Sequence, residues 1–398
     1  MAFLPLLTRN LPALAWLVLS LTNQAEAQAI VEISLSRPSA VAAEGLLHIT
    51  GIRELSDGRV IVLDAGDTRI VQLSADLSRS QQIGRPGRGP DEYSLPRALF
   101  SLAADTTAVL DTGIGRLLVI SPTGRPIATR EARGGTPCSA SSPVVMRLTN
   151  PSTADALGQL YSVANAVRVA ANGTLTPADS AAIVRWGSGC GRDTLAYLPN
   201  YLGLDAMIAG GVLVGRPGSV DRKPFRSEAI WAVSPDGKKL AIAWPTPYRV
   251  EIFELGNRRI KGPLVQYDPI PVTAADRAAW VEAQRQQVAT VMTNNAQRST
   301  VSSRMPDLIA DPKNFPSHLP AFVVNARIFF SGNNQVWIER AESATKGNRY
   351  DVFDSNARLI GSLKLSSERR LIGFGLNSLY LVFTGLDDME YLERYHLP

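Results

Sequence analysis

A hairpin unit that recurs at a fixed spacing limits the possible folds of this chain more than any other feature. The first copy has the turn Asp57-Gly58 between two β-rich runs, and both residues tolerate the positive φ of a tight hairpin. Val62-Leu63-Asp64 aligns with Val109-Leu110-Asp111, and Arg69-Ile70-Val71 aligns with Arg116-Leu117-Leu118, both at an offset of 47 residues. Four short strands repeated every 40–50 residues or so are typical of a β-propeller blade.

Less regular copies of the unit follow along the chain. They cover roughly residues 144–198, 229–253, 321–365 and 371–395. The last copy is one strand short, and the alternating segment Ile30–Leu35 is predicted to supply the missing strand and so to close the ring without an exposed sheet edge. We therefore expect an all-β fold, a single six-bladed β-propeller over residues 30–398.

One segment departs from the β pattern. Small and apolar residues recur at helical spacing through residues 273–298, and Thr273 with Asp276 resembles a capping box. The sequence predicts a helical insertion between two blades, lying over one face of the disc. Its most economical interpretation is a surface helix without a binding role.

The N-terminus has the pattern of a secretory signal peptide over residues 1–27. Arg9 precedes the apolar run Leu11–Leu21, whose 11 residues are fewer than the ~20 that span a bilayer, and Ala25-Glu26-Ala27 is a cleavage site. No cysteine follows the run, which excludes a lipoprotein anchor, whereas an uncleaved N-terminal anchor stays open. No other run is long enough for a membrane helix, so we expect a periplasmic or secreted protein with no membrane span after cleavage.

Composition narrows the chemistry further. The 398 residues are 45% hydrophobic and 19% charged, which excludes a disordered chain or a coiled coil. The arginines are scattered without a long basic run, so nucleic acid is not an expected partner despite a net charge of +5. We expect a monomer. In an oxidising compartment the two cysteines, Cys138 and Cys190, are predicted to form a disulfide, with free thiols as the alternative.

A longer motif resembles a known family. Gly84-Arg85-Pro86-Gly87-Arg88-Gly89-Pro90-Asp91-Glu92-Tyr93 is similar to a signature of bacterial exported six-bladed propellers related to NHL repeats. The resemblance implies the same fold and says little about activity, because this fold carries many functions. Lyases of the NHL type hold a divalent metal with histidines at the central channel, and lactonase-like propellers hold calcium with Glu, Asn and Asp.

Against that background, the candidates for a metal or a ligand site are few. His48 and His318 each precede a predicted inner strand, but no third partner is evident, and Glu54, Asn165 and Asn325 do not align with the calcium pattern. We therefore predict no cofactor, with calcium or zinc as the alternative. Asp64 and Asp111 recur at one blade position, which indicates a repeated structural hydrogen bond.

The leading functional hypothesis is a non-catalytic binding or scaffold propeller for a protein, peptide or glycan ligand. Arg53 and Arg97, with Arg85 and Arg88 nearby in sequence, would favour an acidic ligand, although plain surface arginine is the more economical interpretation of each. The candidate ligand residues are therefore His48, Arg53, Arg97 and His318. The alternative is a metal-dependent NHL-type lyase or lactonase with its site at the channel.

Overall fold

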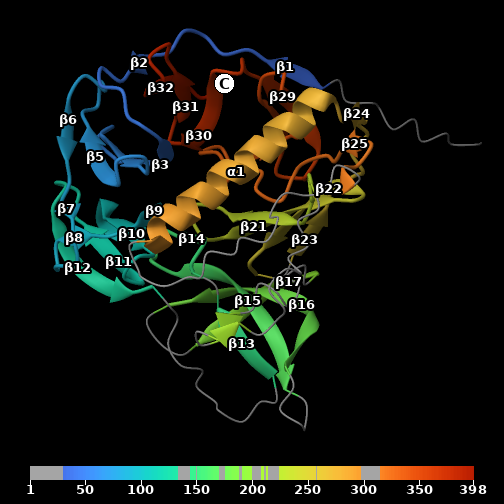
Figure 1. Cartoon of the computed structure of the whole chain (residues 1–398), viewed down its shortest axis with the longest axis horizontal. Coiled ribbons are helices and arrows are strands. Elements are labelled where there is room, and N and C mark those ends of the chain that lie inside the picture. The colour runs from blue at the N-terminus through green and yellow to red at the C-terminus, as the bar shows by residue number, and fades with distance from the viewer. Residues whose placement is uncertain are drawn as a thin grey trace, which may run out of the picture.

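The structure, a computed structural model, is a six-bladed β-propeller, as the sequence predicts (Figure 1). It describes residues 30–132, 144–148, 150–169, 175–187, 191–199, 208–209, 212–213, 224–256, 258–296 and 314–398. The predicted signal peptide at residues 1–27 and both Cys138 and Cys190 lie outside these ranges. No helix within them is long and apolar enough to cross a membrane.

The first three blades follow one another along the chain, each beginning at the strand nearest the axis. Blade 1 consists of β3 (Ile49–Glu54), β4 (Val60–Asp64), β5 (Arg69–Leu73) and β6 (Ser80–Gln82). Blade 2 consists of β9 (Pro96–Ser101), β10 (Thr107–Asp111), β11 (Arg116–Ile120) and β12 (Pro126–Glu131). Blade 3 consists of β13 (Val144–Leu148) and β14 (Thr153–Ala154), which both pair with β15 (Leu160–Val169), then β16 (Leu175–Trp186) and β17 (Arg192–Pro199).

The other three blades complete the ring. Blade 4 consists of β20 (Ile230–Val233), β21 (Lys239–Pro245), β22 (Tyr248–Glu254) and β23 (Arg258–Lys261). Blade 5 consists of β26 (Ile328–Phe330), β27 (Val336–Glu339), β28 (Arg349–Phe353), β29 (Leu359–Lys364) and β1 (Val31–Ile33). Blade 6 consists of β30 (Arg369–Phe374), β31 (Ser378–Thr384), β32 (Glu390–His396) and β2 (Ala40–Val41).

The remaining elements connect or cover the blades. They are β7 (Arg85–Pro86) with β8 (Glu92–Tyr93), the 3-10 helix η1 (Ala103–Asp105), β18 (Ile208–Ala209) with β19 (Val212–Leu213), β24 (Ile270–Pro271) with β25 (His318–Leu319), and α1 (Ala274–Ala296).

The N-terminal segment closes the ring, but not through the residues that the sequence indicated. The alternating segment at residues 30–35 was expected in the last blade, whereas its strand β1 pairs in parallel with β29 as a fifth strand of blade 5. The outer strand of blade 6 is β2, which pairs with β32. That expectation was wrong because a two-residue strand has no readable alternation, whereas β1 does alternate and belongs to the neighbouring blade.

The core is divided among the six contacts between neighbouring blades. Each contact has its own cluster of buried hydrophobic residues, including the one between blades 6 and 1, which joins Ile49 and Val62 to Ile372 and Tyr380. Strand β4 shows the reason. All five of its residues are buried, because the two faces of a middle strand pack on different neighbouring blades. The ring is thus closed by apolar packing as well as by β2.

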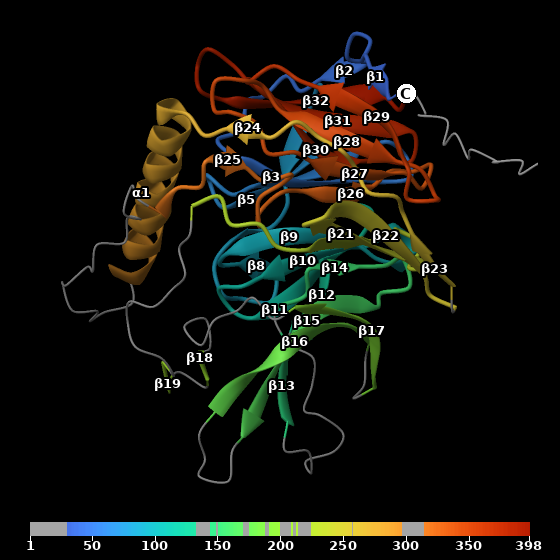
Figure 2. The same ribbon diagram turned by 90° about the vertical axis from the view of Figure 1, so that its right-hand side faces the viewer.

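Helix α1 lies across the opening of the ring on one face of the disc (Figures 1 and 2). Its first turn has the predicted capping box, because the Asp276 carboxylate accepts hydrogen bonds from the Thr273 N–H and hydroxyl, both at 2.7 Å. The other oxygen of Asp276 accepts from Ser343 and Ala344 in the β27–β28 loop. This loop lies at the end of the disc where the inner strands begin, which we call the helix face.

Candidate functional site

In blades 1 and 2, the backbone just before the inner strand is fixed by an aspartate that ends the second strand. Asp64 ends β4 and accepts hydrogen bonds from the backbone N–H groups of Leu47 (3.3 Å) and His48 (2.9 Å), as well as Gly66 (3.1 Å). Asp111 ends β10 and accepts from Ser94 and Leu95 (both 2.9 Å), as well as Gly113 (3.0 Å). These three partners are displaced by 47 residues, which confirms the repeated structural hydrogen bond predicted for these two aspartates.

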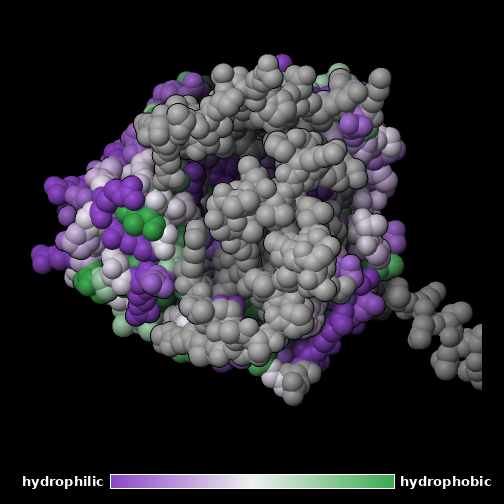
Figure 3. Space-filling model, turned by 60° about the horizontal axis from the view of Figure 1, so that its bottom comes forward, coloured by the Kyte–Doolittle hydropathy of each residue, from purple (hydrophilic) through white to green (hydrophobic). Residues whose placement is uncertain are grey.

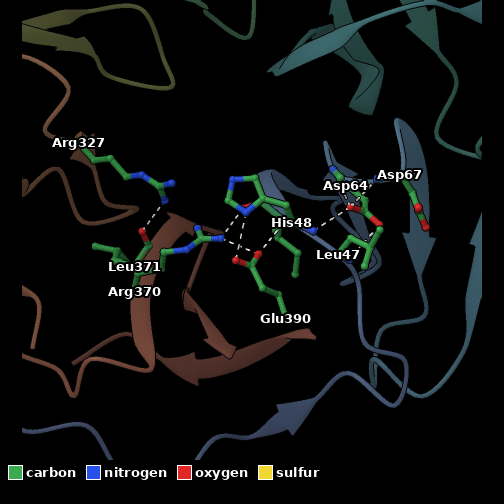
Figure 4. A network of polar contacts seen from close by, with 10 residues as sticks. Leu47, His48, Asp64, Asp67, Arg327, Arg370, Leu371 and Glu390 are labelled. Carbon is green, nitrogen blue, oxygen red and sulfur yellow. Dashed lines mark hydrogen bonds and ion pairs between the residues drawn. The ribbon is translucent and has the colours of Figure 1, made fainter. Parts of the chain in front are cut away.

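In blade 1 the residue fixed in this way is His48, which lies at the mouth of the channel. Its backbone is fixed by Asp64, while its side chain is 55% exposed (Figure 4). Its Nδ1 lies 3.2 Å from Oε1 of Glu390, which begins β32 in the last blade. The second ring nitrogen, Nε2, has no hydrogen-bond partner among the described residues, so the imidazole is oriented by one nitrogen and leaves the other for a ligand.

Glu390 links the histidine to an arginine. Its Oε2 accepts a hydrogen bond from Arg370 Nη2 at 2.6 Å and from the Ile49 N–H at 2.5 Å. Arg370 Nη2 also donates to the Ile49 carbonyl oxygen at 2.7 Å. Burial favours the neutral acid, but the hydrogen bonds from His48 and Arg370 outweigh it and lower the pKa of Glu390 to about 2. The carboxylate is therefore ionised and fully engaged inside the wall.

A second arginine reaches the same place from blade 5. Arg327 immediately precedes β26, and its Nη1 donates to the Leu371 carbonyl oxygen at 3.0 Å, next to Arg370 in the chain. Its backbone N–H donates to the Glu339 carboxylate at 2.9 Å. Glu339 ends β27 and so fixes the backbone just before the inner strand of blade 5, as Asp64 does in blade 1. Burial and the nearby Arg370 charge lower the pKa of Arg327. Figure 4 shows the ends of Arg327, Arg370 and His48 converging.

The other candidate residues lie elsewhere. Arg53 occupies the far end of β3, where its Nη2 donates to Asp105 of blade 2 at 3.0 Å and its side chain is only 9% exposed. Arg97 lies at the helix-face end of β9, is exposed, and makes no side-chain hydrogen bond or ion pair within the described ranges. His318 lies in β25, which pairs with β24 at the periphery of the ring, so the structure does not bring it to His48 (Figure 1).

A metal site does not form from these residues. Within the residues that the structure describes, no three His, Cys, Asp or Glu side chains group as metal ligands. His48 has one carboxylate neighbour, Glu390, and that carboxylate is already bound to Arg370. Of the calcium candidates, Glu54 accepts a hydrogen bond from Tyr380 and Asn325 is exposed, while the side chain of Asn165 is outside the described set.

The glycine-rich motif at residues 84–93 folds around its own glutamate. Glu92 Oε2 accepts from the backbone N–H groups of Arg88 (2.9 Å) and Gly89 (2.7 Å), and Oε1 accepts from Arg85 Nε (2.8 Å). A Cβ at Gly87 would overlap the Glu92 carboxylate, so glycine is required there. The motif is thus a loop ordered around Glu92 that joins blades 1 and 2.

Sequence reasoning missed Glu390, Arg370 and Arg327. Glu390 is 342 residues from His48, and only closure of the ring brings them together. The one usable signal was that Arg370 immediately precedes the last repeat copy at residues 371–395, much as His48 precedes the inner strand of the first copy.

Comparisons with known proteins give structural likenesses at low sequence identity. No protein-family model and no curated protein matches this chain. A member of the DUF4221 family from Bacteroides vulgatus is 9% identical, covering 93% of this chain and all of that one, with a TM-score of 0.49. A protein described as exported from Bacteroides fragilis is 13% identical (94% and 98% covered, TM-score 0.43), and virginiamycin B lyase from Staphylococcus aureus is 10% identical (89% and 98%, TM-score 0.41). At such identities no residue role is carried over.

Proposed function

We propose that this propeller is an exported, non-catalytic binding protein that takes its ligand at the channel mouth on the helix face. The channel end of a propeller gathers side chains from all blades around one opening, which suits ligand recognition. Here His48, Arg370 and Arg327 come from three consecutive blades in ring order and converge at that opening (Figure 4).

The observation that carries this proposal is the exposed His48 at a position where the fold does not need it. Blade 2 builds the same backbone around Asp111 with Leu95 in place of histidine. The blade itself does not require an imidazole at this position. An exposed imidazole held in one orientation by a buried carboxylate therefore points to recognition.

The surface that the structure describes agrees with recognition by polar contacts. Figure 3 views the molecule with its lower edge turned forward, and hydrophilic residues predominate on the described part of that view, with hydrophobic residues in small separate spots. The exposed large hydrophobic residues are scattered over several blades, for example Leu157, Leu376 and Leu386. Such scattering provides no broad apolar face for a permanent partner among these residues.

The test is a thermal-shift screen of the purified protein against a panel of short peptides and oligosaccharides. The variant His48→Leu copies the residue of blade 2, so we expect it to fold normally and to lose the ligand-induced rise in Tm. His318→Leu is the matched control and should respond as the natural protein does. Equal responses from all three proteins would overturn the proposal.

An enzyme is the second candidate, and the His48–Glu390 pair is what favours it. A carboxylate that holds Nδ1 leaves Nε2 free to accept a proton, which a lyase or lactonase would use. The described residues do not fit the divalent metal of NHL-type lyases, so a metal-dependent reaction lacks a ligand set here. Metal analysis of the purified protein, together with turnover of a lactone panel before and after EDTA, separates this candidate from simple binding.

A further inference from the structure

We propose that the channel mouth recognises a carboxylate group on its ligand, and that the specificity comes from Arg370, Arg327 and Arg97 together with His48. This inference rests on the proposed function, since it names the ligand chemistry of the same site. The four side chains belong to blades 6, 5, 2 and 1, which are consecutive around the ring, and each lies at the helix-face start of an inner strand.

The acidic groups around the mouth are already occupied. Glu390 is 10% exposed and binds Arg370, the Ile49 N–H and His48. Asp64 is fully buried and binds backbone N–H groups and Arg69, and Glu339 holds the Arg327 N–H. Basic groups are accessible there, because His48 and Arg97 are exposed and Arg370 is 21% exposed.

The arginines also have unused hydrogen-bonding capacity. Arg370 Nη2 makes two hydrogen bonds, whereas its buried Nη1 has no partner among the described residues. The hydroxyl of Thr50, next in the chain to the Ile49 carbonyl that Arg370 binds, is likewise without a partner there. Arg97 makes no side-chain contact of this kind at all within the same ranges. Unpaired donors on neighbouring inner strands call for an acceptor, and a buried donor left unpaired is costly.

The positive side chains at the mouth favour an anionic group on the ligand. Arg327 and Arg370 lie beside Glu390, whose carboxylate is already bound to Arg370 and His48. A carboxylate is planar and matches an arginine fork, so it can accept two parallel hydrogen bonds from one guanidinium group.

Helix α1 sets the shape of the ligand. It lies across the opening of the ring, on the side where the inner strands begin, and so restricts the approach of a globular partner (Figures 1 and 2). The carboxylate must therefore be carried by a slender molecule such as an acidic peptide or a uronic-acid oligosaccharide.

The test is titration calorimetry at low ionic strength with two acidic probes, tetraglutamate and tetragalacturonate, and two neutral counterparts, tetraglutamine and maltotetraose; inorganic phosphate is the fifth probe. We expect at least one acidic probe to bind and its neutral counterpart to bind at least about tenfold more weakly. The two acidic probes distinguish a peptide from a glycan source.

The deciding variant is Arg97→Ala, because an exposed arginine without side-chain partners in the described part of the chain can be removed without unfolding the ring. It should weaken binding of the acidic probe about tenfold, as should His48→Leu, while Arg79→Ala, an exposed arginine in the β5–β6 turn, should change nothing. Failure of every acidic probe to bind, equal binding of the neutral probes, tighter binding of phosphate, or an unaffected Arg97→Ala would overturn the inference. If neutral probes bind and His48→Leu still abolishes that binding, the proposed function survives; if His48→Leu has no effect on any bound probe, it fails too.

Discussion

Blades 1 and 2 have the same scaffold and different surfaces. Asp64 and Asp111 are both fully buried and hold equivalent backbone groups, so the two blades present their inner strands in the same way. Blade 1 then displays His48 and borders the last blade through Glu390, whereas blade 2 displays Leu95 and borders blade 1 through the loop around Glu92. Positions that repeat between the blades serve the fold, and the position that differs points to function.

The largest effects should come from the shared position. Asp64→Ala leaves four backbone N–H groups without their acceptor and Asp111→Ala leaves three, so we expect each to lower the free energy of unfolding by about 3 kcal/mol. Urea unfolding followed by circular dichroism measures both. If one variant kept full stability, the two aspartates would not be structural equivalents and the comparison would fail.

A smaller effect is expected at Glu390, which has no counterpart in blade 2. Glu390→Gln should cost about 2 kcal/mol at neutral pH, because the charged hydrogen bonds to Arg370 and the Ile49 N–H are weakened. The pKa of Glu390 is lowered to about 2 from 4.5, so its contribution is complete above about pH 4.5 and is lost as the pH falls towards 2. The stability gap between the natural protein and the variant should therefore close over that interval.

Urea midpoints measured between pH 7 and pH 2.5 check this behaviour. Glu131→Gln, an exposed glutamate at the end of β12, is the control and should show no gap at any pH. A gap for Glu390→Gln that stayed constant down to pH 2.5 would contradict the linkage.

The arginines that begin β5 and β11 make different contacts in the two blades, and replacing them should cost less stability. Arg116 Nη2 donates to the Gly89 and Glu92 carbonyl oxygens, both at 2.6 Å, so Arg116→Met should cost about 1.5 kcal/mol and expose the loop at residues 84–93. Arg69, its equivalent in blade 1, binds Asp64 instead, at 3.3 Å. Hydrogen exchange should rise in that loop for Arg116→Met and stay unchanged there for Arg69→Met.

The smallest stability effect belongs to His48→Leu, which gives blade 1 the residue of blade 2. We expect the free energy of unfolding to change by less than about 1 kcal/mol, as for other substitutions near the surface. Chemical unfolding beside the binding assay gives both quantities. A loss comparable to that of Asp64→Ala would mean that His48 holds the ring together rather than serving a ligand.

The sequence predicted what local patterns encode. The Asp-Gly hairpin, the offset of 47 residues and the Thr273–Asp276 capping box each depend on neighbours in the chain, and each is found in the structure. The closing strand and the polar cluster depend on contacts across the whole chain, such as His48 with Glu390 and Arg370 with Ile49. No local pattern pairs residues that meet only when the ring closes, so of the site only His48 and Arg97 could be proposed in advance.

Histidine-selective NMR is the most direct measurement of the claim that ligand binds at His48. The chain has three histidines, His48, His318 and His396, so its labelled ring spectrum is simple, and His48→Leu identifies the decisive signal. Titration with the tightest-binding acidic probe should shift the His48 signal alone and leave those of His318 and His396 in place. A saturating probe that leaves the His48 signal unmoved would contradict a ligand site at the channel mouth.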